Sequence, residues 1–81
     1  MRVKVSFYSY FKELAGCSEI AQELPEDSKL EELLQALWKR FPQLKPMQRS
    51  TLVAVGIEYQ EPGYVLKEGD EVSLFPPVQG G

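Results

Sequence analysis

The sequence predicts a single α+β domain in which one helix packs across a mixed β-sheet. Apolar residues recur at helical spacing through residues 28–41. Polar and apolar residues alternate in short segments near both ends of the chain, which is typical of half-buried strands. The length of 81 residues leaves room for one hydrophobic core. A long helix with strands before and after it favours the α+β class.

The N-terminal part is predicted to form a strand, a short helical turn and a second strand. The first strand covers residues 2–8, where apolar and polar side chains alternate. A helical turn over residues 10–16 ends at Gly16, since glycine suits the left-handed position that terminates a helix. A weaker strand follows at residues 19–25. The residues of the first strand that we expect to face the core are Val3, Val5 and Phe7.

The strongest predicted element is the helix over residues 28–41. Ser28 and Glu31 have the spacing of a capping box, in which each side chain satisfies a free backbone donor of the first turn. Pro42 should stop the helix, because proline disfavours helical backbone in the residue before it. Residues 43–50 are predicted as a polar connection. The apolar stripe expected to pack on the core is Leu30, Leu33, Leu34, Leu37, Trp38 and Phe41.

The C-terminal half is predicted to add three strands, which brings the sheet to about five strands. Residues 51–57 are apolar at successive positions, as in a strand buried on both faces. A short strand then leads into Pro62 and Gly63, which predict a type II turn with positive φ at the glycine. Another turn at residues 67–70 precedes the last strand, residues 71–75, with Val72 and Leu74 facing the core.

The composition excludes most catalytic side-chain machinery. The chain has no histidine and a single cysteine, Cys17, so neither a Cys–His nucleophile pair nor a Cys/His zinc site is available. We therefore expect no metal, no stably bound cofactor and no independent enzymatic activity. For Cys17 we expect a small packing role.

Charge, hydropathy and cysteine content limit the classes of partner and the cellular compartment that we expect. A net charge of −3 with scattered basic residues disfavours nucleic acid. No apolar run approaches the length of a membrane span, so no membrane association is expected. An unpaired cysteine suits a reducing compartment, and we expect a cytoplasmic protein.

The end of the sequence, "FPPVQGG", suggests a body of residues 1–76 followed by an extended tail of residues 77–81. Pro76 and Pro77 donate no backbone hydrogen bond, so the last strand must end there. Their fixed φ keeps the exit stiff and extended.

The remaining tail residues have different predicted uses. Val78 and Gln79 extend the reach of the tail. Gly80 and Gly81 lack a Cβ, so their backbone can pass through a narrow channel in another protein. On composition alone, a frayed terminus with small residues is the favoured interpretation, and a second observation shifts the balance.

Three aromatic residues point to a docking surface beside the tail. By strand alternation, Tyr8 and Phe75 face away from the helix. If the first and last strands are adjacent and parallel, both rings lie at the same end of the sheet. Tyr59 could join them. An exposed aromatic cluster is typical of a protein interface.

These residues and motifs give the chain a resemblance to the ubiquitin-like β-grasp sulfur carriers. It most closely resembles those that form the small subunit of molybdopterin synthase. The resemblance covers essentially the whole chain. It is carried by the segments "VKVSFYSYFKELAG", "LVAVG" and "LKEGDEVSLFPPVQGG". It implies a β-grasp fold, with the sheet wrapped around the long helix.

The resemblance also implies a chemistry at the C-terminus. An activating enzyme would use ATP to adenylate the Gly81 carboxylate, and a sulfur donor would displace AMP to leave a thiocarboxylate. The tail would then enter the large subunit of molybdopterin synthase, in a heterotetramer, and give its sulfur to a cyclic pterin monophosphate. Gly80 matches the penultimate glycine that permits this access. The residues expected to contact partners are Tyr8, Tyr59, Phe75, Pro76, Pro77, Val78 and Gln79.

Other functions stay open at this point. The same tail would serve a sulfur carrier for thiamine, cysteine or tRNA thiolation. A ubiquitin-like modifier would instead join Gly81 to a lysine of a target protein. A plain binding module would have an inert tail.

Overall fold

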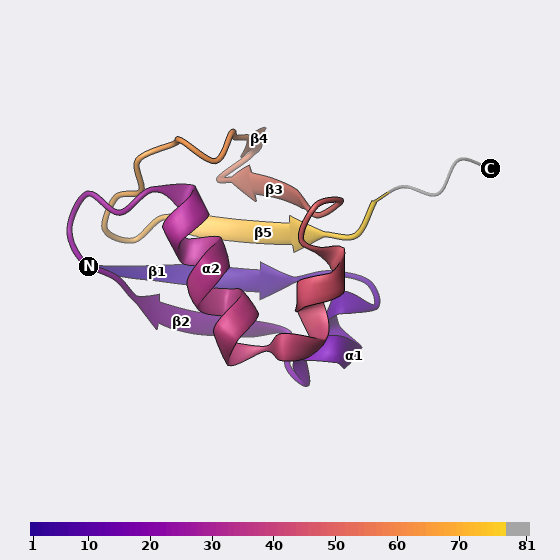
Figure 1. Ribbon diagram of the computed structural model, residues 1–81. Coiled ribbons are helices and arrows are strands. Elements are labelled where there is room, and N and C mark those ends of the chain that lie inside the picture. Colours follow the sequence, from indigo (N-terminus) through magenta and orange to yellow (C-terminus); the bar gives the residue numbers. More distant parts are fainter. Residues whose placement is uncertain (78–81) are drawn as a thin grey trace.

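A computed structural model describes residues 1–77 and has one helix lying across one face of a five-stranded sheet (Figure 1). The strand order is β2-β1-β5-β3-β4. No helix among the described residues is long and apolar enough to cross a membrane. The elements are β1 (Arg2–Phe7), α1 (Phe11–Ala15), β2 (Glu19–Glu23), α2 (Leu30–Arg40), the 3₁₀ helix η1 (Pro42–Met47), β3 (Leu52–Val55), β4 (Glu58–Tyr59) and β5 (Glu71–Phe75).

The sheet is mixed, with the first and last strands side by side at its centre. β1 and β5 run parallel, from the pair Lys4 and Glu71 to the pair Phe7 and Leu74. The other neighbours, β1 with β2, β3 with β5 and β3 with β4, are antiparallel. The predicted α+β class, the mixed sheet and the β-grasp arrangement are therefore confirmed.

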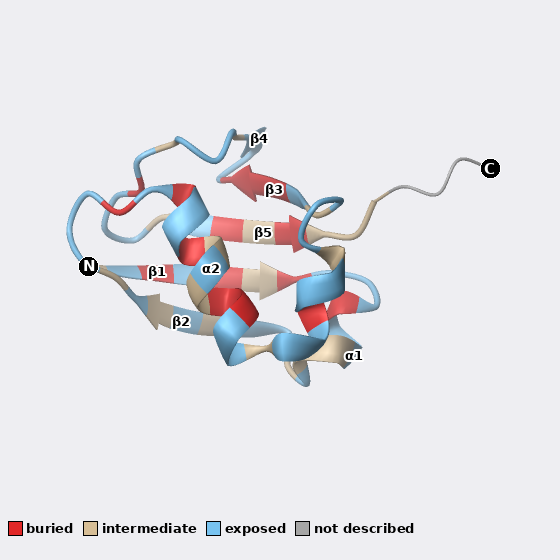
Figure 2. Ribbon diagram, viewed as in Figure 1, coloured by how far each residue is buried: buried red, intermediate tan, exposed pale blue. Residues whose placement is uncertain are grey.

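The core lies between the sheet and α2, where Figure 2 shows the buried positions facing one another. Strand alternation places every second residue of β1 and β5 against the helix, as predicted. A ring contact between Phe7 and Phe41, 5.4 Å between centroids, joins β1 to the end of α2. Leu34 and Phe41 are only partly buried. The most deeply buried strand and helix residues are Val3, Val5, Phe7, Leu30, Leu33, Leu37, Val72 and Leu74.

The start of α2 differs from the prediction. The N-cap residue is Lys29, and its backbone N–H donates to the Glu32 carboxylate at 3.0 Å. The predicted capping box of Ser28 and Glu31 is therefore wrong by one residue. Ser28 is buried, and its hydroxyl donates to the Pro25 carbonyl at 2.8 Å. The serine thus closes the turn before the helix, which leaves the capping role to Glu32.

The segment after α2 is helical where a polar connection was predicted. The helix ends at Arg40, as Pro42 required, and the Phe41 N–H donates to the Leu37 carbonyl at 2.7 Å. Pro42 then begins η1, since proline fits the first turn of a helix. Leu44 is fully buried under this turn and Met47 packs partly buried against the core, so two apolar residues anchor an otherwise polar segment.

The turns were predicted at the right places, with one error of type. Gly16 ends α1 with a left-handed φ of 79°, and the turn at residues 67–70 has Gly69 at φ 83°. The Tyr64 N–H donates to the Glu61 carbonyl at 3.0 Å, which confirms a turn around Gly63. However, Gly63 does not have positive φ, so the turn is not of type II.

Candidate docking surface at the end of the sheet

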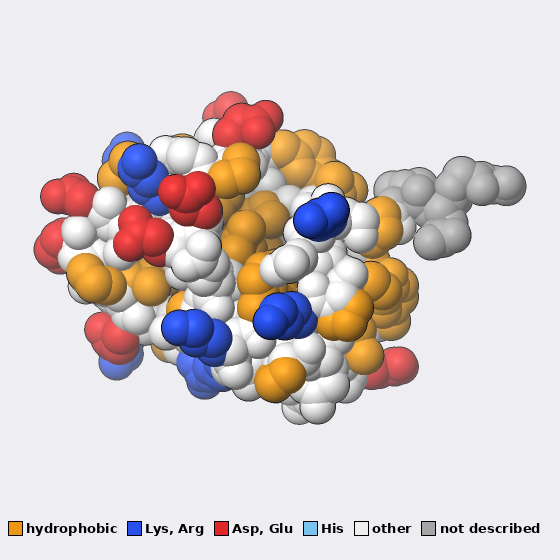
Figure 3. Space-filling model, viewed as in Figure 1, with side chains coloured by type: hydrophobic (Ala, Val, Ile, Leu, Met, Phe, Trp, Pro, Cys, Tyr) orange, Lys and Arg blue, Asp and Glu red, His pale blue; other side chains and the backbone are white. Residues whose placement is uncertain are grey.

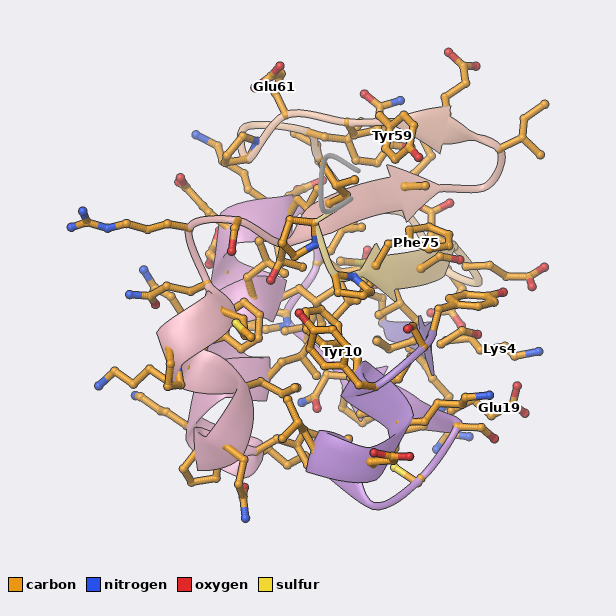
Figure 4. The ribbon with its side chains drawn as sticks, turned by 90° about the vertical axis from the view of Figure 1, so that its right-hand side faces the viewer. Lys4, Tyr10, Glu19, Tyr59, Glu61 and Phe75 are labelled. Atoms are coloured by element: carbon orange, nitrogen blue, oxygen red, sulfur yellow. The ribbon has the colours of Figure 1, made fainter. Side chains whose placement is uncertain are left out.

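The face of the sheet away from α2 carries a cluster of aromatic rings where β5 ends. Tyr8 stacks on Phe75, with 4.7 Å between ring centroids and 15° between ring planes. Tyr59 meets Phe75 edge-on at 6.5 Å. Figure 4 looks onto this end of the molecule and shows Tyr59 above Phe75. The structure thus brings together the three predicted aromatic residues, which come from β5, β4 and the residue after β1.

Strand phase explains why these rings share a face. Tyr8 follows the buried Phe7 and continues the parallel ladder, because its N–H donates to the Leu74 carbonyl at 3.2 Å. One residue beyond a buried position, a strand side chain points to the opposite face. Phe75 follows the buried Leu74 in the same way. Tyr8 is 44% exposed and Tyr59 is 69% exposed, so the cluster offers apolar surface to another protein.

A fourth residue, Leu52, belongs to this surface, and Tyr10 lies near it; the sequence did not single out either residue. Leu52 lies opposite Phe75 in the register of β3 and β5, and cross-strand partners share one face. The sequence could not identify Leu52 as exposed, because its strand is apolar at every position. Tyr10, 36% exposed, lies at the same end of the molecule below Phe75 (Figure 4). We call Tyr8, Leu52, Tyr59 and Phe75 the docking surface.

Charged side chains border the docking surface on the same face of the sheet. Lys4 lies 3.4 Å from Glu19 of β2 and 4.0 Å from Glu71 of β5. All three side chains are about half or more exposed, so these ion pairs add little stability. They give the apolar cluster a polar rim, which is how protein interfaces are commonly built.

β5 leads from the docking surface into Pro76 and Pro77, the last residues that the structure describes. Both prolines are partly buried. The predictions for Val78, Gln79, Gly80 and Gly81, and the boundary between a body of 1–76 and a tail of 77–81, fall on or depend on residues outside the described part. They stay predictions.

The remaining candidate chemistry concerns metal ligands and Cys17. Among residues 1–77 there is no group of three His, Cys, Asp or Glu side chains that could hold a metal ion. Cys17 is partly buried, and its sulfur lies 3.9 Å from the Ala15 carbonyl oxygen. This arrangement fits the predicted packing role of Cys17. The site is therefore a surface that can hold a partner beside the point where the C-terminal residues begin.

Known proteins resemble this chain in sequence and in fold. The sequence pattern of the ThiS family matches residues 5–81. A molybdopterin synthase sulfur carrier subunit from Chlamydomonas reinhardtii is 34% identical, and the match covers 100% of each chain. A solved chain described as a candidate molybdopterin converting factor subunit 1 from Pyrococcus furiosus is 32% identical with a TM-score of 0.89, over 96% of this chain and 99% of that one.

A third match comes from a complex. It is a chain in the solved protein–protein complex of subunits 1 and 2 of the molybdopterin-converting factor from Helicobacter pylori. That chain is 29% identical, with a TM-score of 0.74 and 100% of both chains covered. The family pattern spans nearly the whole sequence, and the relatives match it from end to end. This chain therefore belongs to the ThiS family and is related over its full length to the sulfur carrier subunits of molybdopterin synthase.

Proposed function

We propose that this protein is the sulfur carrier subunit of a molybdopterin synthase. The observation that carries the proposal is the full-length similarity to sulfur carrier subunits. The sequence also has two terminal glycines, and the exposed aromatic cluster includes Phe75 at the end of β5. The chain has no histidine and one cysteine, so it lacks a Cys–His nucleophile pair. In this proposal it acts as the sulfur-donating part of a larger enzyme.

The reacting group in this proposal is the carboxylate of Gly81. A carboxylate is a poor acyl donor, because oxide would have to leave. Transfer of AMP from ATP to the carboxylate, with release of pyrophosphate, supplies a good leaving group. A sulfur donor then displaces AMP and leaves a thiocarboxylate, whose sulfur is an intrinsically strong nucleophile. The sulfur forms a bond to a carbon of the pterin substrate, and an oxygen substituent leaves that carbon. Water then cleaves the acyl–sulfur bond, which leaves the sulfur on the pterin and regenerates the Gly81 carboxylate.

Three kinds of partner follow from this chemistry. An adenylating enzyme consumes the ATP, a sulfur donor supplies the sulfur, and a large synthase subunit binds the cyclic pterin monophosphate. The complex of subunits 1 and 2 from Helicobacter pylori supports a partner of the last kind, and we propose a heterotetramer of two small and two large subunits. We expect the assembly to work in the cytoplasm.

The docking surface gives the tail a fixed starting point in this proposal. Phe75 contacts both Tyr8 and Tyr59, and the tail begins two residues after Phe75. A partner that binds these rings holds the base of a short arm. The reacting sulfur is then confined near the substrate, which raises its effective concentration and keeps water away.

Intact-mass spectrometry tests the proposal directly. The chain is incubated with its activating enzyme, ATP and a sulfur source, and a reaction without ATP serves as the control. We expect a gain of about 16 Da, since one oxygen of Gly81 is replaced by sulfur. If the mass stays unchanged under conditions that charge a characterised relative, the protein is not a sulfur carrier.

Two further readouts separate this function from the alternatives. Expression in a strain that lacks the small subunit of molybdopterin synthase should restore molybdopterin, whereas a carrier for thiamine, cysteine or tRNA thiolation should not. A protein modifier would instead add about 9 kDa, the mass of this chain, to other proteins, and denaturing gels would reveal these adducts.

A further inference from the structure

Charge is segregated along this chain in a way that the proposed function does not use. Residues 33–57 contain four of the nine basic residues and none of the twelve acidic ones, although the whole chain has a net charge of −3. The structure gathers these cations over the end of α2 and over η1, whereas most acidic side chains in this view lie toward the left and the top (Figure 3). The four cations are Lys39, Arg40, Lys45 and Arg49.

A cavity of about 440 Å³ lies between α2 and η1, under two of these cations. Trp38 and Pro42 form its apolar part, and Lys39 and Lys45 line it as well. Trp38 is 8% exposed, so only part of the indole is accessible. A cavity with an apolar surface and two ammonium groups suits an anionic segment that carries an apolar side chain.

A second cavity connects this place to the docking surface. It measures about 340 Å³, and Leu34, Leu52 and Tyr59 line it together with the charged residues Arg49 and Glu61. Gln48 lines both cavities, so they adjoin at this residue. Leu52 and Tyr59 also belong to the docking surface. Two neighbouring cavities therefore lie between the aromatic cluster and the basic end of α2, and we call them together the groove.

The cations of the groove are not neutralised by the rest of the described chain. In residues 1–77, the ion pairs involve only the Met1 amine, Arg2 and Lys4 as cations. Arg40 is engaged elsewhere, since its guanidinium donates to the Ala21 carbonyl and the Gln22 side chain of β2. Lys39, Lys45 and Arg49 are exposed and remain available to a partner.

We propose that the groove binds an acidic segment of the large synthase subunit, with its negative charges against Lys39, Lys45 and Arg49 and an apolar side chain in the cavity beside Trp38. This inference rests on the proposed function, because it assigns a second contact to the same partner. The groove is continuous with the docking surface, which favours one partner for both. A protein fits better than a nucleic acid, because the acidic remainder of the chain repels a long polyanion.

Matched charge reversals test this assignment. The variants are Lys39→Glu/Lys45→Glu in the groove and Lys29→Glu/Lys67→Glu among the acidic residues at the other end. Both double variants change the net charge by the same amount, so they differ only in where the charge is placed. Circular dichroism verifies that both fold. Stopped-flow fluorescence then measures the association rate of each full-length chain with the large subunit.

We expect Lys39→Glu/Lys45→Glu to slow association about tenfold or more at low salt, because complementary charges steer encounter. The control variant should slow it much less. In 1 M NaCl, where the Debye length is about 3 Å, the two variants should converge. Equal slowing by both variants at low salt would overturn the inference and leave the proposed function standing. Failure of the unmodified chain to bind the large subunit would overturn both.

A labelled single-stranded RNA of twelve uridines is the second probe. We expect no binding of this RNA at physiological salt. Binding that depends on Lys39 and Lys45, and that the large subunit does not displace, would assign the groove to nucleic acid and overturn the inference.

Discussion

Phe75 is the residue on which the docking surface depends. It stacks on Tyr8 and meets Tyr59 edge-on, so each of the other two rings is held by contact with it. Such aromatic pairs prefer defined relative orientations. A partner therefore meets side chains that are already ordered, and less conformational entropy is lost on binding.

Replacing Phe75 with alanine should weaken the complex with the large subunit by about 2 kcal/mol, as is typical of a buried aromatic anchor at an interface. Isothermal titration calorimetry measures the change. Ile57→Ala is the matched control, because Ile57 is 100% exposed in the turn between β3 and β4 and lies outside the docking surface. If Ile57→Ala weakens binding as much as Phe75→Ala, the docking surface is wrongly placed.

Two glycines allow a test of backbone conformation at constant packing. An added Cβ would meet no atom within 4 Å at either Gly16 or Gly63, but only Gly16 has positive φ. Gly16→Ala should destabilise the fold by about 1 kcal/mol, because alanine is strained in the left-handed region. Gly63→Ala should change stability by less than about 0.5 kcal/mol. Thermal unfolding measures both, and equal losses would contradict the assigned backbone conformations.

At the level of elements, α2 supplies the core side chains that hold the sheet in shape. Its buried stripe covers β1 and β5, the two central strands. A domain of this size holds only about 3–5 kcal/mol from its single core. The loss of one well-packed helix residue is therefore comparable to the whole stability of the fold.

Leu37→Ala should cost about 3 kcal/mol, because Leu37 is fully buried and the change leaves a cavity. Leu34→Ala should cost roughly half as much, since Leu34 is only partly buried. Urea unfolding followed by circular dichroism compares the two variants. A larger loss for Leu34→Ala would show that the helix is rotated relative to the arrangement described above.

The sequence predicted the elements well and their ends less well. The helical stripe and the alternation in β1 and β5 reflect burial, which repeats over several residues and is robust to single exceptions. The cap of α2 depends on one hydrogen bond, and Ser28 satisfied its hydroxyl with Pro25 instead. The helical turn of η1 depends on the burial of Leu44, a long-range contact that no local pattern reports.

At the level of the whole molecule, the docking surface is assembled by the order of the strands. Tyr8 and Phe75 are far apart in sequence and meet because β1 and β5 run parallel in register. Alternation predicted which way each ring points, and adjacency of the strands was the added assumption that the structure confirmed. Leu52 could not be predicted in the same way, because in an all-apolar strand alternation does not distinguish the two faces.

Deleting Gly80 and Gly81 should abolish sulfur loading while leaving the melting temperature unchanged within about 2 °C, since deletions that remove no core contact have little effect on stability. Among residues 1–77, the residues of the buried core fall between Val3 and Leu74 in the sequence. Intact mass reports the loading, and differential scanning calorimetry reports the stability. A large fall in melting temperature would show that the two glycines pack on the domain.

The central position of β5 makes closure of the sheet depend on a strand that follows all the other described strands in the sequence. β5 is paired with β1 on one side and with β3 on the other, and among residues 1–77 it is the last strand to emerge from the ribosome. The sheet cannot close before synthesis reaches Phe75, because contacts so distant in sequence form only once both segments are available. A nascent chain, or one clipped by a protease upstream of β5, lacks both the middle of its sheet and its docking surface. A partner that recognises this surface would therefore bind only chains in which β5 has already joined the sheet.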